Sequence, residues 1–585
     1  MELNDSQIEA VSYGEGPLLI TAGAGSGKTR TLTQRVAHLI QEGTPADRIL
    51  AITFTNKAAD EMKKRIAGEL IKSGLGKGGL PFVGTFHAFS AHILRKEAKK
   101  AGRDYNYIIF DDGDSKKVIR QIIKSLNFDE NKRITPLTAR KEISKIKIGL
   151  SDLGDVDPKI RLIYEEYEKS LKNQNAFDFD DLITKVVRIF IEQPGTLKKH
   201  QDRFDYILVD EYQDINKAQY ELVSLLAQNH GNINVVGDDQ QSIYAFRGAS
   251  IETFIGFEKQ WPKTKIVHLG ENYRSTKNIV NAAAGVIKNN RFQIPKDLWT
   301  KNPEGSPVRV IAARSSSDES DIISEKILSG GFRESAILYR TNAQSRAIEQ
   351  SLNYNSIPYE IYGGVRFYER KEIKDILAPL RYALNPKDKV SEDRINKTFK
   401  KAVREELKEK LPGLAKQLGL MELIGYVLKT TDYFTHLNAK FENSADRNEN
   451  VQELISYAAT FEDLSEFIEK VSLLESSEKI ADKLRQEGSK DAIVKLMTIH
   501  LAKGLEFDDV YIAGTNEGIL PHQRSYFREA DPEEERRLMY VAMTRARNNL
   551  FISFYGLASR FLYEIPPELV KFNVDDGLEE TIYLD

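Results

Sequence analysis

The chain has 585 residues, 41% of them hydrophobic and 29% charged, and its formal net charge is −3. At about 150 residues per compact domain, this length predicts several domains, and the composition excludes a disordered, collagen-like or membrane-embedded chain. The lack of cysteine excludes disulfides, thiol nucleophiles and cysteine-bound metal sites. We expect a cytoplasmic protein, because the N-terminus lacks a secretory pattern and no apolar run approaches about 18 residues.

The first part of the chain alternates short apolar runs with helical patterns, which is typical of a parallel α/β sheet. The runs at 17–20 and 49–54 are predicted to be buried strands. Between about 90 and 200 the pattern becomes helical and charged, which predicts an inserted helical domain. Strand-like runs return at 206–209 and 233–236 and are expected to resume the first sheet.

A second α/β section is predicted after the Pro- and Gly-containing stretch 302–307. It is interrupted by a helical, heavily charged segment from about 385 to 490. The predicted architecture is therefore two α/β lobes, each carrying a mainly helical insertion. Strands of the second lobe are expected at 308–312, 335–339, 494–497 and 510–513.

A phosphate-binding loop directly follows the first strand. Its glycines let backbone N–H groups turn toward phosphate oxygens at a helix N-terminus, where the helix dipole also favours negative charge. Lys28 is expected to reach the β- and γ-phosphates, and the Thr29 hydroxyl to bind magnesium. The loop consists of Ala22, Gly23, Ala24, Gly25, Ser26, Gly27, Lys28 and Thr29.

Two adjacent acids end the strand-like run at 207–209. Asp210 suits a second magnesium contact, and Glu211 suits the general base that orients an attacking water. Acids often end strands simply because the chain leaves the core there. The complete phosphate loop upstream favours the catalytic interpretation.

Further short motifs follow in order over nearly the whole chain. Together with the phosphate loop and the acidic pair, they resemble the UvrD/PcrA/Rep group of superfamily 1A DNA helicases. The main ones are Leu3-Asn4 with Gln7, Thr53-Phe54-Thr55-Asn56, Thr85-Phe86-His87, Asp178-Phe179-Asp180-Asp181, Gly237-Asp238 through Gln241 and Tyr244 to Arg247, Asn272-Tyr273-Arg274, Tyr339-Arg340, His500 with Glu506, Thr544-Arg545, and Arg560-Phe561.

The resemblance implies two RecA-like P-loop lobes that use ATP and magnesium. It implies a 3′–5′ single-stranded DNA translocase and helicase that binds single strands and single-/double-strand junctions in replication or repair. The implied domains are a first lobe at 1–89 and 201–274, its insertion at 90–200, a second lobe at 275–384 and 491–585, and its insertion at 385–490.

The resemblance also implies roles at the nucleotide. Gln7 resembles the residue that reads adenine, and an amide can pair with the N6/N7 edge of that base. Tyr273 resembles the ring that stacks on it, and Glu506 the acceptor for the ribose hydroxyl. Arg274 and Arg545 resemble the two arginines that meet the γ-phosphate, and Gln241 the residue that senses it.

A single-stranded DNA track is implied as well, since aromatic stacking on a basic groove holds bases without reading their sequence. Phe246 departs from relatives that carry tryptophan, so we expect a smaller stacking area there. Arg340 and His87 are expected to contact the DNA backbone. The full set is Phe54, Thr55, Asn56, His87, Phe179, Tyr244, Phe246, Arg247, Arg340, His500 and Phe561.

Two departures from the family bear on duplex DNA. The second insertion has only about 105 residues, against roughly 180 implied by the resemblance, and no duplex-gripping Gly-Ile-Gly loop is recognisable. A long basic C-terminal tail is also not expected. The alternatives are the motor subunit of a recombination nuclease, which needs a nuclease domain, and a non-catalytic DNA-binding scaffold, which would lack residues such as Lys28 or Glu211.

Overall fold

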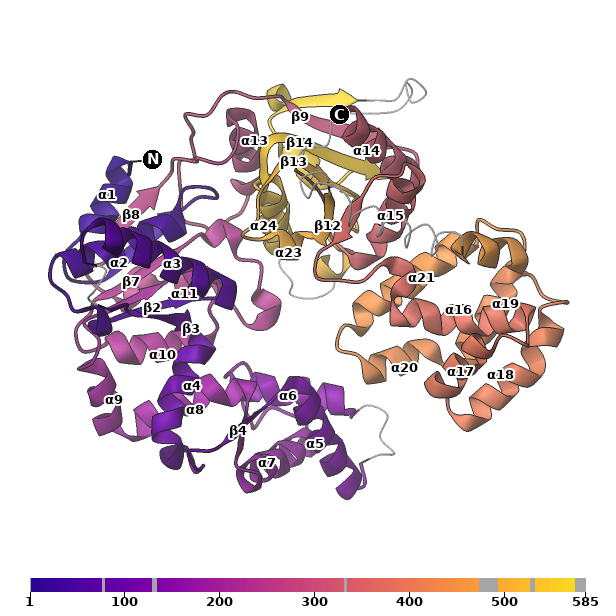
Figure 1. Cartoon of the computed structure of the whole chain (residues 1–585), viewed down its shortest axis with the longest axis horizontal. Helices are drawn as coiled ribbons and strands as arrows, with labels where there is room; N and C mark the ends of the chain where they lie inside the picture. The colour runs from indigo at the N-terminus through magenta and orange to yellow at the C-terminus, as the bar shows by residue number, and fades with distance from the viewer. Residues whose placement is uncertain are drawn as a thin grey trace. The chain divides into compact units, whose positions relative to one another are not determined.

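The computed structural model describes residues 2–75, 79–128, 134–330, 334–472, 493–526 and 532–573. The chain forms two compact units, Met1–Arg274 with Asn290–Lys301, and Ser275–Asn289 with Asn302–Asp585 (Figure 1). The segment Asn290–Lys301 belongs to the first unit, whereas the sequence analysis assigned it to the second lobe. Within the described ranges, no helix is both long and apolar enough to cross a membrane.

The first unit is built on a six-stranded sheet in which every pairing is parallel. Its central strands are buried on both faces, which is why their sequences are continuous apolar runs. In sheet order the strands are β3 (Phe82–Thr85), β2 (Ile49–Thr53), β6 (Tyr206–Val209), β7 (Ile233–Gly237), β1 (Leu18–Ala22) and β8 (Lys265–Leu269).

Helices cover both faces of this sheet. Leu18 and Ile20 face one way and pack with α2 (Lys28–Gln41) and α3 (Asn56–Lys72). Leu19 faces the other way and packs with α4 (Phe86–Glu97), α8 (Phe179–Glu192) and α10 (Lys217–Ala227). The helices around the sheet are α1 (Asp5–Ser12), α2 (Lys28–Gln41), α3 (Asn56–Lys72), α4 (Phe86–Glu97), α10 (Lys217–Ala227), α11 (Ile251–Ile255) and α12 (Phe257–Gln260).

The first insertion has its own apolar core, to which Ile119, Ile143 and Tyr167 contribute from three helices. It also contains a parallel pair of short strands that the sequence analysis did not predict, β4 (Ile108–Phe110) and β5 (Ala176–Asp178). Its helices are α5 (Asp112–Ser125), α6 (Pro136–Lys147), α7 (Pro158–Asn173), α8 (Phe179–Glu192) and α9 (Pro194–Gln201).

The second unit contains a seven-stranded sheet, again parallel at every pairing. In order, its strands are β11 (Tyr359–Ile361), β12 (Val494–Thr498), β10 (Ser335–Tyr339), β13 (Phe507–Ile512), β14 (Ala546–Tyr555), β9 (Val308–Ala313) and β15 (Val570–Asn573). The helices around it are α13 (Lys277–Ile287), α14 (Ser316–Gly330), α15 (Ser345–Tyr354), α23 (Ile499–Ala502) and α24 (Pro532–Met543). The predicted α/β class with two parallel sheets is confirmed.

The second insertion is helical, and its core begins earlier than residue 385, because Ile373, Leu377 and Leu380 of α16 pack with the helices that follow. The helices are α16 (Lys371–Leu384), α17 (Lys389–Thr398), α18 (Lys401–Leu414), α19 (Leu420–Thr431), α20 (Tyr433–Lys440), α21 (Ser444–Ala458) and one at 464–472. Residues 473–492, which the sequence analysis placed in and just after this insertion, lie outside the described ranges.

Candidate functional site

The site residues predicted in the first unit follow the carboxyl ends of its strands. The phosphate loop follows β1, Asp210 follows β6, and Gln241 lies just beyond β7. Arg274 lies beyond β8, which neighbours β1. Since all strands of the sheet are parallel, these ends meet at one edge, where α/β proteins commonly bind ligands.

Local geometry explains the glycines of the phosphate loop. Gly25 and Gly27 have φ angles of +70° and +84°, in the left-handed region that glycine adopts without strain. A Cβ on Gly25 would also come within 2.8 Å of both Arg274 Cβ and Asn272 Nδ2. Gly27 caps α2, so the helix N-terminus and its N–H groups point into the loop.

Lys28 is the first residue of α2, and its ammonium is buried near carboxylates. Its Nζ donates to the carbonyl of Gly23 at 3.3 Å and lies 3.9 Å from Asp238 Oδ2. Burial lowers the pKa of Lys28, and the charges of Asp238 and Glu211 oppose that shift. A phosphate would add negative charge where the ammonium now has little solvent.

The acidic pair meets the phosphate loop directly. The Thr29 hydroxyl donates to Asp210 Oδ2 at 3.1 Å. Burial, and then the neighbouring charge of Glu211, raises the pKa of Asp210 to about 7. Glu211 has a φ of +52°, a strained conformation for a residue with a side chain. Its carboxylate accepts a hydrogen bond from Gln213 Nε2 at 2.6 Å.

Asp238 connects several of these groups, although the sequence analysis gave it no role. Its backbone N–H donates to Gln213 Oε1 at 2.9 Å, and its carboxylate accepts from Gln241 Nε2 at 2.5 Å. The Gln213 side chain therefore links the Glu211 carboxylate to the backbone of Asp238 by hydrogen bonds. The Asp238 carboxylate in turn holds the Gln241 amide. The Gly237-Asp238 pair beyond an apolar strand was the available sequence signal.

Lys296 is a second residue that the sequence analysis missed. Its Nζ lies 2.6 Å from Asp238 Oδ1 and 2.6 Å from Asp239 Oδ1, and its side chain is 2% exposed. Burial disfavours the ammonium, yet these two carboxylates raise the pKa of Lys296. No local pattern in 290–301 indicates this contact, because it depends on the return of that segment to the first unit.

Gln7 and Tyr273 belong to one hydrogen-bonded group. Gln7 Nε2 donates to the Ser26 carbonyl at 3.0 Å, and Gln7 Oε1 accepts from the Asn4 backbone at 3.2 Å. The Tyr273 hydroxyl accepts from Asn4 Nδ2 and donates to Glu271, each at 2.8 Å. An amide has two N–H groups and two oxygen lone pairs, so Gln7 keeps capacity for a base edge.

The segment that carries Arg274 is anchored to the phosphate loop. Asn272 Nδ2 donates to the Ala24 carbonyl at 2.7 Å, and the Tyr273 N–H donates to the Gly25 carbonyl at 3.0 Å. The Arg274 N–H in turn donates to Asn272 Oδ1 at 2.8 Å. A displacement of the phosphate loop would therefore also displace the backbone of Arg274.

Three predicted DNA-contacting aromatics form one cluster at the edge of the first sheet. The rings of Phe54 and Tyr244 are stacked, with centroids 5.7 Å apart and an angle of 11°. Phe246 meets Tyr244 edge-on at 6.0 Å and is 67% exposed. The Arg247 guanidinium lies 5.4 Å from the centroids of both Tyr244 and Phe246, which adds positive charge to the cluster.

A second pair of predicted residues stacks separately. His87 and Phe179 have ring centroids 4.0 Å apart at an angle of 27°, and Phe179 is 52% exposed. Burial lowers the pKa of His87 to about 4, so its ring is neutral at pH 7. Thr55 and Asn56 are exposed, and Thr55 caps α3 by accepting from the Ala58 N–H.

In the second unit the predicted residues lie at opposite edges of the sheet. Glu506 and Arg545 immediately precede β13 and β14, whereas Arg340 and His500 follow β10 and β12. The Arg545 side chain is buried, and its guanidinium donates to the Leu505 carbonyl at 3.1 Å. Glu506 is exposed.

Two side chains of the second unit that were predicted to contact DNA, Arg340 and Phe561, make contacts within that unit. Arg340 is engaged by its own unit, since it makes a bidentate ion pair with Glu535 at 2.7 to 3.2 Å. Phe561 is 0% exposed, and the Arg536 guanidinium lies 5.3 Å from its ring. This burial corrects the expectation that Phe561 offers a ring for base stacking. Phe561 lies in the 3-10 turn Arg560–Glu564, in which Leu562 is buried as well.

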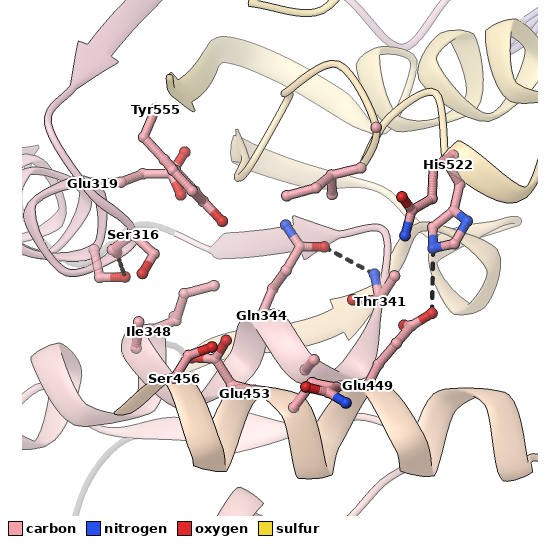
Figure 2. A pocket seen from close by; sticks show the side chains of 17 residues that line it. Ser316, Glu319, Thr341, Gln344, Ile348, Glu449, Glu453, Ser456, His522 and Tyr555 are labelled. Atoms are coloured by element: carbon pink, nitrogen blue, oxygen red, sulfur yellow. Dashed lines mark hydrogen bonds and ion pairs between the residues drawn. The ribbon is translucent and has the colours of Figure 1, made fainter. Parts of the chain in front are cut away.

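A cavity of about 300 Å³ lies within the second unit, where α21 faces loops at the carboxyl ends of the strands. Figure 2 shows Gln344 beside Thr341, and His522 directed at Glu449, with His522 Nε2 3.3 Å from Glu449 Oε1. Glu319 also lines it, and burial raises the pKa of this carboxyl to about 7. None of the residues predicted from the sequence lines this cavity.

Comparisons with known proteins agree with the geometry. Residues 3–262 match the UvrD/REP helicase N-terminal domain, and residues 267–446 and 427–556 match the UvrD-like helicase C-terminal domain. The chain is 39% identical over 644 aligned positions to the ATP-dependent DNA helicase PcrA of Bacillus subtilis, covering 97% of this chain and 86% of that protein. That alignment is longer than this chain, so the relative carries residues that this chain lacks.

PcrA of Staphylococcus epidermidis is also 39% identical, with 99% of this chain and 88% of the relative covered. Among solved structures, the C-terminal domain of a possible DNA helicase from Lactobacillus plantarum aligns with 52% of this chain and 98% of that one. Its TM-score of 0.24 and 13% identity are too low to support an argument. The matches to both family domains, together with 39% identity over nearly the full length of the chain, show that the chain belongs to the UvrD/REP helicase family.

Proposed function

We propose that this protein is an ATP-dependent DNA helicase and single-stranded DNA translocase that moves 3′ to 5′. The observation that carries the proposal is the meeting of the phosphate loop with the acidic pair, where Thr29 Oγ1 lies 3.1 Å from Asp210 Oδ2 beside Glu211. The PcrA relatives, named as ATP-dependent DNA helicases, support the choice of reaction.

Magnesium fits this arrangement. Asp210 and Glu211 place two carboxylates together, and burial, followed by the charge of Glu211, raises the pKa of Asp210 against the opposing charge of Lys28. Thr29 and Asp210 would hold the ion, which supplies charge neutralisation at the phosphates when bound. Hydroxyl and carboxylate oxygens are the ligands that this hard cation prefers.

The neighbouring residues have distinct roles in the proposed hydrolysis. Glu211 accepts a proton from, and orients, the attacking water. Gln213 fixes the Glu211 carboxylate, and Asp238 fixes the Gln241 amide, so that Gln241 is held ready to sense a γ-phosphate. Lys28 places its ammonium against the phosphates.

The remaining nucleotide residues extend the proposal. Gln7 reads the adenine edge and Tyr273 stacks on the base, while Glu506 accepts from the ribose. Arg274 and Arg545 supply positive charge as charge builds up in the transition state, an effect worth roughly 10³–10⁵ in rate when an arginine finger provides it.

The proposed DNA track uses stacking rather than base readout. The Phe54–Tyr244–Phe246 cluster with Arg247 and the neutral His87–Phe179 pair both present aromatic rings at the edge of the first sheet. Such rings hold any base, as a translocase requires. Contacts to the DNA backbone are proposed for Arg340, His500, Thr55 and Asn56. Phe561 is not included in the track because its ring is buried.

We expect duplex unwinding by this protein to depend only weakly on α18, the charged helix of the short second insertion. Lys410 pairs with Glu406 at 2.9 Å, and Lys408 with Glu405 at 3.3 Å. Charges that pair along one helix are typical of a solvated face rather than a phosphate-binding patch. Reversing Lys400, Lys401 and Arg404 to glutamate should therefore affect unwinding little.

The test compares ATP hydrolysis with and without single-stranded DNA, then unwinding of duplexes that carry a 3′ or a 5′ tail. We expect strong stimulation by single strands and unwinding of the 3′-tailed duplex alone. Lys28→Met serves as the inactive control. Unstimulated hydrolysis would refute the translocase, and preference for the 5′ tail would refute the polarity.

A further inference from the structure

A buried ionic network in the first insertion lies directly behind the His87–Phe179 stack. Phe179 is the first residue of α8, and Asp178 caps that helix. Asp178 Oδ1 accepts from the Asp181 N–H at 2.9 Å, while Asp181 Oδ2 accepts from the Asp178 N–H at 3.3 Å. The orientation of Phe179 therefore depends on a capping box made of two buried carboxylates.

These carboxylates would repel each other without a cation. Lys147, the last residue of α6, supplies it: Lys147 Nζ lies 2.9 Å from both Asp178 Oδ2 and Asp181 Oδ1, and 2.7 Å from Glu168 Oε1. Its side chain is 3% exposed, and the three carboxylates raise its pKa despite burial. Tyr167 adds a hydrogen bond to Asp178 Oδ2 at 3.1 Å.

Two other cations, Lys185 and Arg140, lie near the same carboxylates. Lys185 contacts Glu168 at 2.7 Å and, of the two capping carboxylates, Asp181 at 3.5 Å. Arg140 pairs with Asp180 at 2.8 Å; burial raises the pKa of Asp178, but the charge of Lys147 and then that of Arg140 lower it. Lys147 is thus the cation that bridges both members of the capping box to the rest of the insertion.

We propose that Lys147 is a positioning residue for DNA binding: it holds the capping box of α8 so that Phe179 stays stacked on His87 and presents its face to a base. This rests on the proposed function, because it assigns the stack to single-stranded DNA. Lys147 acts through Asp178 and Asp181, and its buried ammonium makes no contact with a phosphate.

Two consequences separate positioning from the alternatives. A lysine that binds a phosphate contributes to the salt dependence of DNA affinity, whereas a buried positioning lysine does not. Also, if Lys147 acts only through Phe179, its loss should cost nothing further once the ring is gone. A lysine that merely stabilises the insertion would add its effect to that of Phe179→Ala.

The experiment measures the single-stranded DNA concentration for half-maximal ATPase activity, at several salt concentrations, for Lys147→Met, Phe179→Ala and the double variant. We expect Lys147→Met to raise this concentration about tenfold, the order expected for one weakened base stack, with a maximal rate within about twofold and an unchanged salt slope. The double variant should match Phe179→Ala. Lys145→Met, on the exposed face of α6, should stay within twofold of wild type.

Lys147→Met leaves three carboxylates with one lysine, so a folding defect is a foreseeable result. In that case the cycle is repeated with Asp181→Asn added to every variant, including the reference, since asparagine can still accept the capping hydrogen bond. An unchanged half-saturation, a shallower salt slope or additive effects would overturn the inference while wild-type stimulation upholds the proposed function. Unstimulated wild-type ATPase would overturn both.

Discussion

Lys296 gives the sharpest test of the nucleotide site, because its removal leaves two adjacent buried carboxylates without their main partner. Nζ lies 2.6 Å from an oxygen of each of Asp238 and Asp239, and the remaining cation, Lys28, lies 3.9 Å from Asp238. Breaking one side of a buried ion pair typically costs about 3–5 kcal/mol. We therefore expect Lys296→Met, which keeps the length of the side chain, to destabilise the first unit by that amount.

At a few degrees per kcal/mol, this loss lowers the melting temperature of the first unit by on the order of 10 °C. Calorimetry measures it, with the transition of the second unit as an internal reference. Lys301→Met is the matched control: it lies in the same segment and pairs with Glu271 at 3.2 Å, but its side chain is 76% exposed. Such a surface pair contributes below about 1 kcal/mol.

The pH dependence of stability should differ between wild type and Lys296→Met. Lys296 and Lys28 hold the pKa of Asp238 low against the effect of burial, so this carboxylate stabilises wild type above its unfolded pKa and stops doing so as the pH falls. In Lys296→Met, protonation of a carboxylate instead relieves repulsion, so the difference in unfolding free energy between this variant and wild type should narrow as the pH falls. Replacing Asp239 by asparagine as well should restore part of the loss. A loss below 1 kcal/mol for Lys296→Met would refute the reasoning.

Three further predictions follow from burial and charge. Glu211→Gln should lower ATP turnover by about 10²–10⁴-fold with little change in nucleotide affinity, and a turnover within tenfold of wild type would exclude Glu211 as the base. Phe246 is exposed, so Phe246→Ala should weaken single-stranded DNA binding by about 1–3 kcal/mol without loss of stability. Phe561 is buried, so Phe561→Ala should lower the free energy of unfolding by about 3–5 kcal/mol, and the reverse pattern would contradict these exposures. Burial raises the pKa of Glu319 to about 7, so the stabilising effect of its protonated carboxyl is present below pH 4.5 and is lost as the pH rises through about 7. In urea titrations, the free energy of unfolding of Glu319→Gln should equal that of wild type at pH 4.5 and exceed it by about 3 kcal/mol at pH 8. A difference that does not change with pH would rule this out.

The sequence predicted those features whose cause is local. Strands such as Leu18–Ala22 are buried on both faces and therefore appear as continuous apolar runs, and the phosphate loop is encoded by its own glycines. β4 escaped prediction because it has three residues and exposes Ile108 and Ile109, so no alternation or long run marks it.

Contacts that depend on the return of a distant segment could not be predicted. Lys296 reaches Asp238 across 58 positions of chain, and nothing near Lys296 indicates an ion pair. Lys147 likewise meets Asp178 from another helix of the insertion. Phe561 lies in a motif expected to line the DNA groove, and only the packing of its turn shows that the ring is inside.

The path of the chain between the two units limits how the protein can be taken apart. The chain passes from one unit to the other three times, after Arg274, Asn289 and Lys301. A fragment that stops at Arg274 would keep the whole six-stranded sheet but lose the lysine that neutralises Asp238 and Asp239. Proteolytic cleavage at any one crossing would leave a part of one unit on the polypeptide that carries the other unit. An isolated first unit therefore needs either residues 1–301 or a fused 290–301 segment, and the simplest truncation is the one least suited to expression.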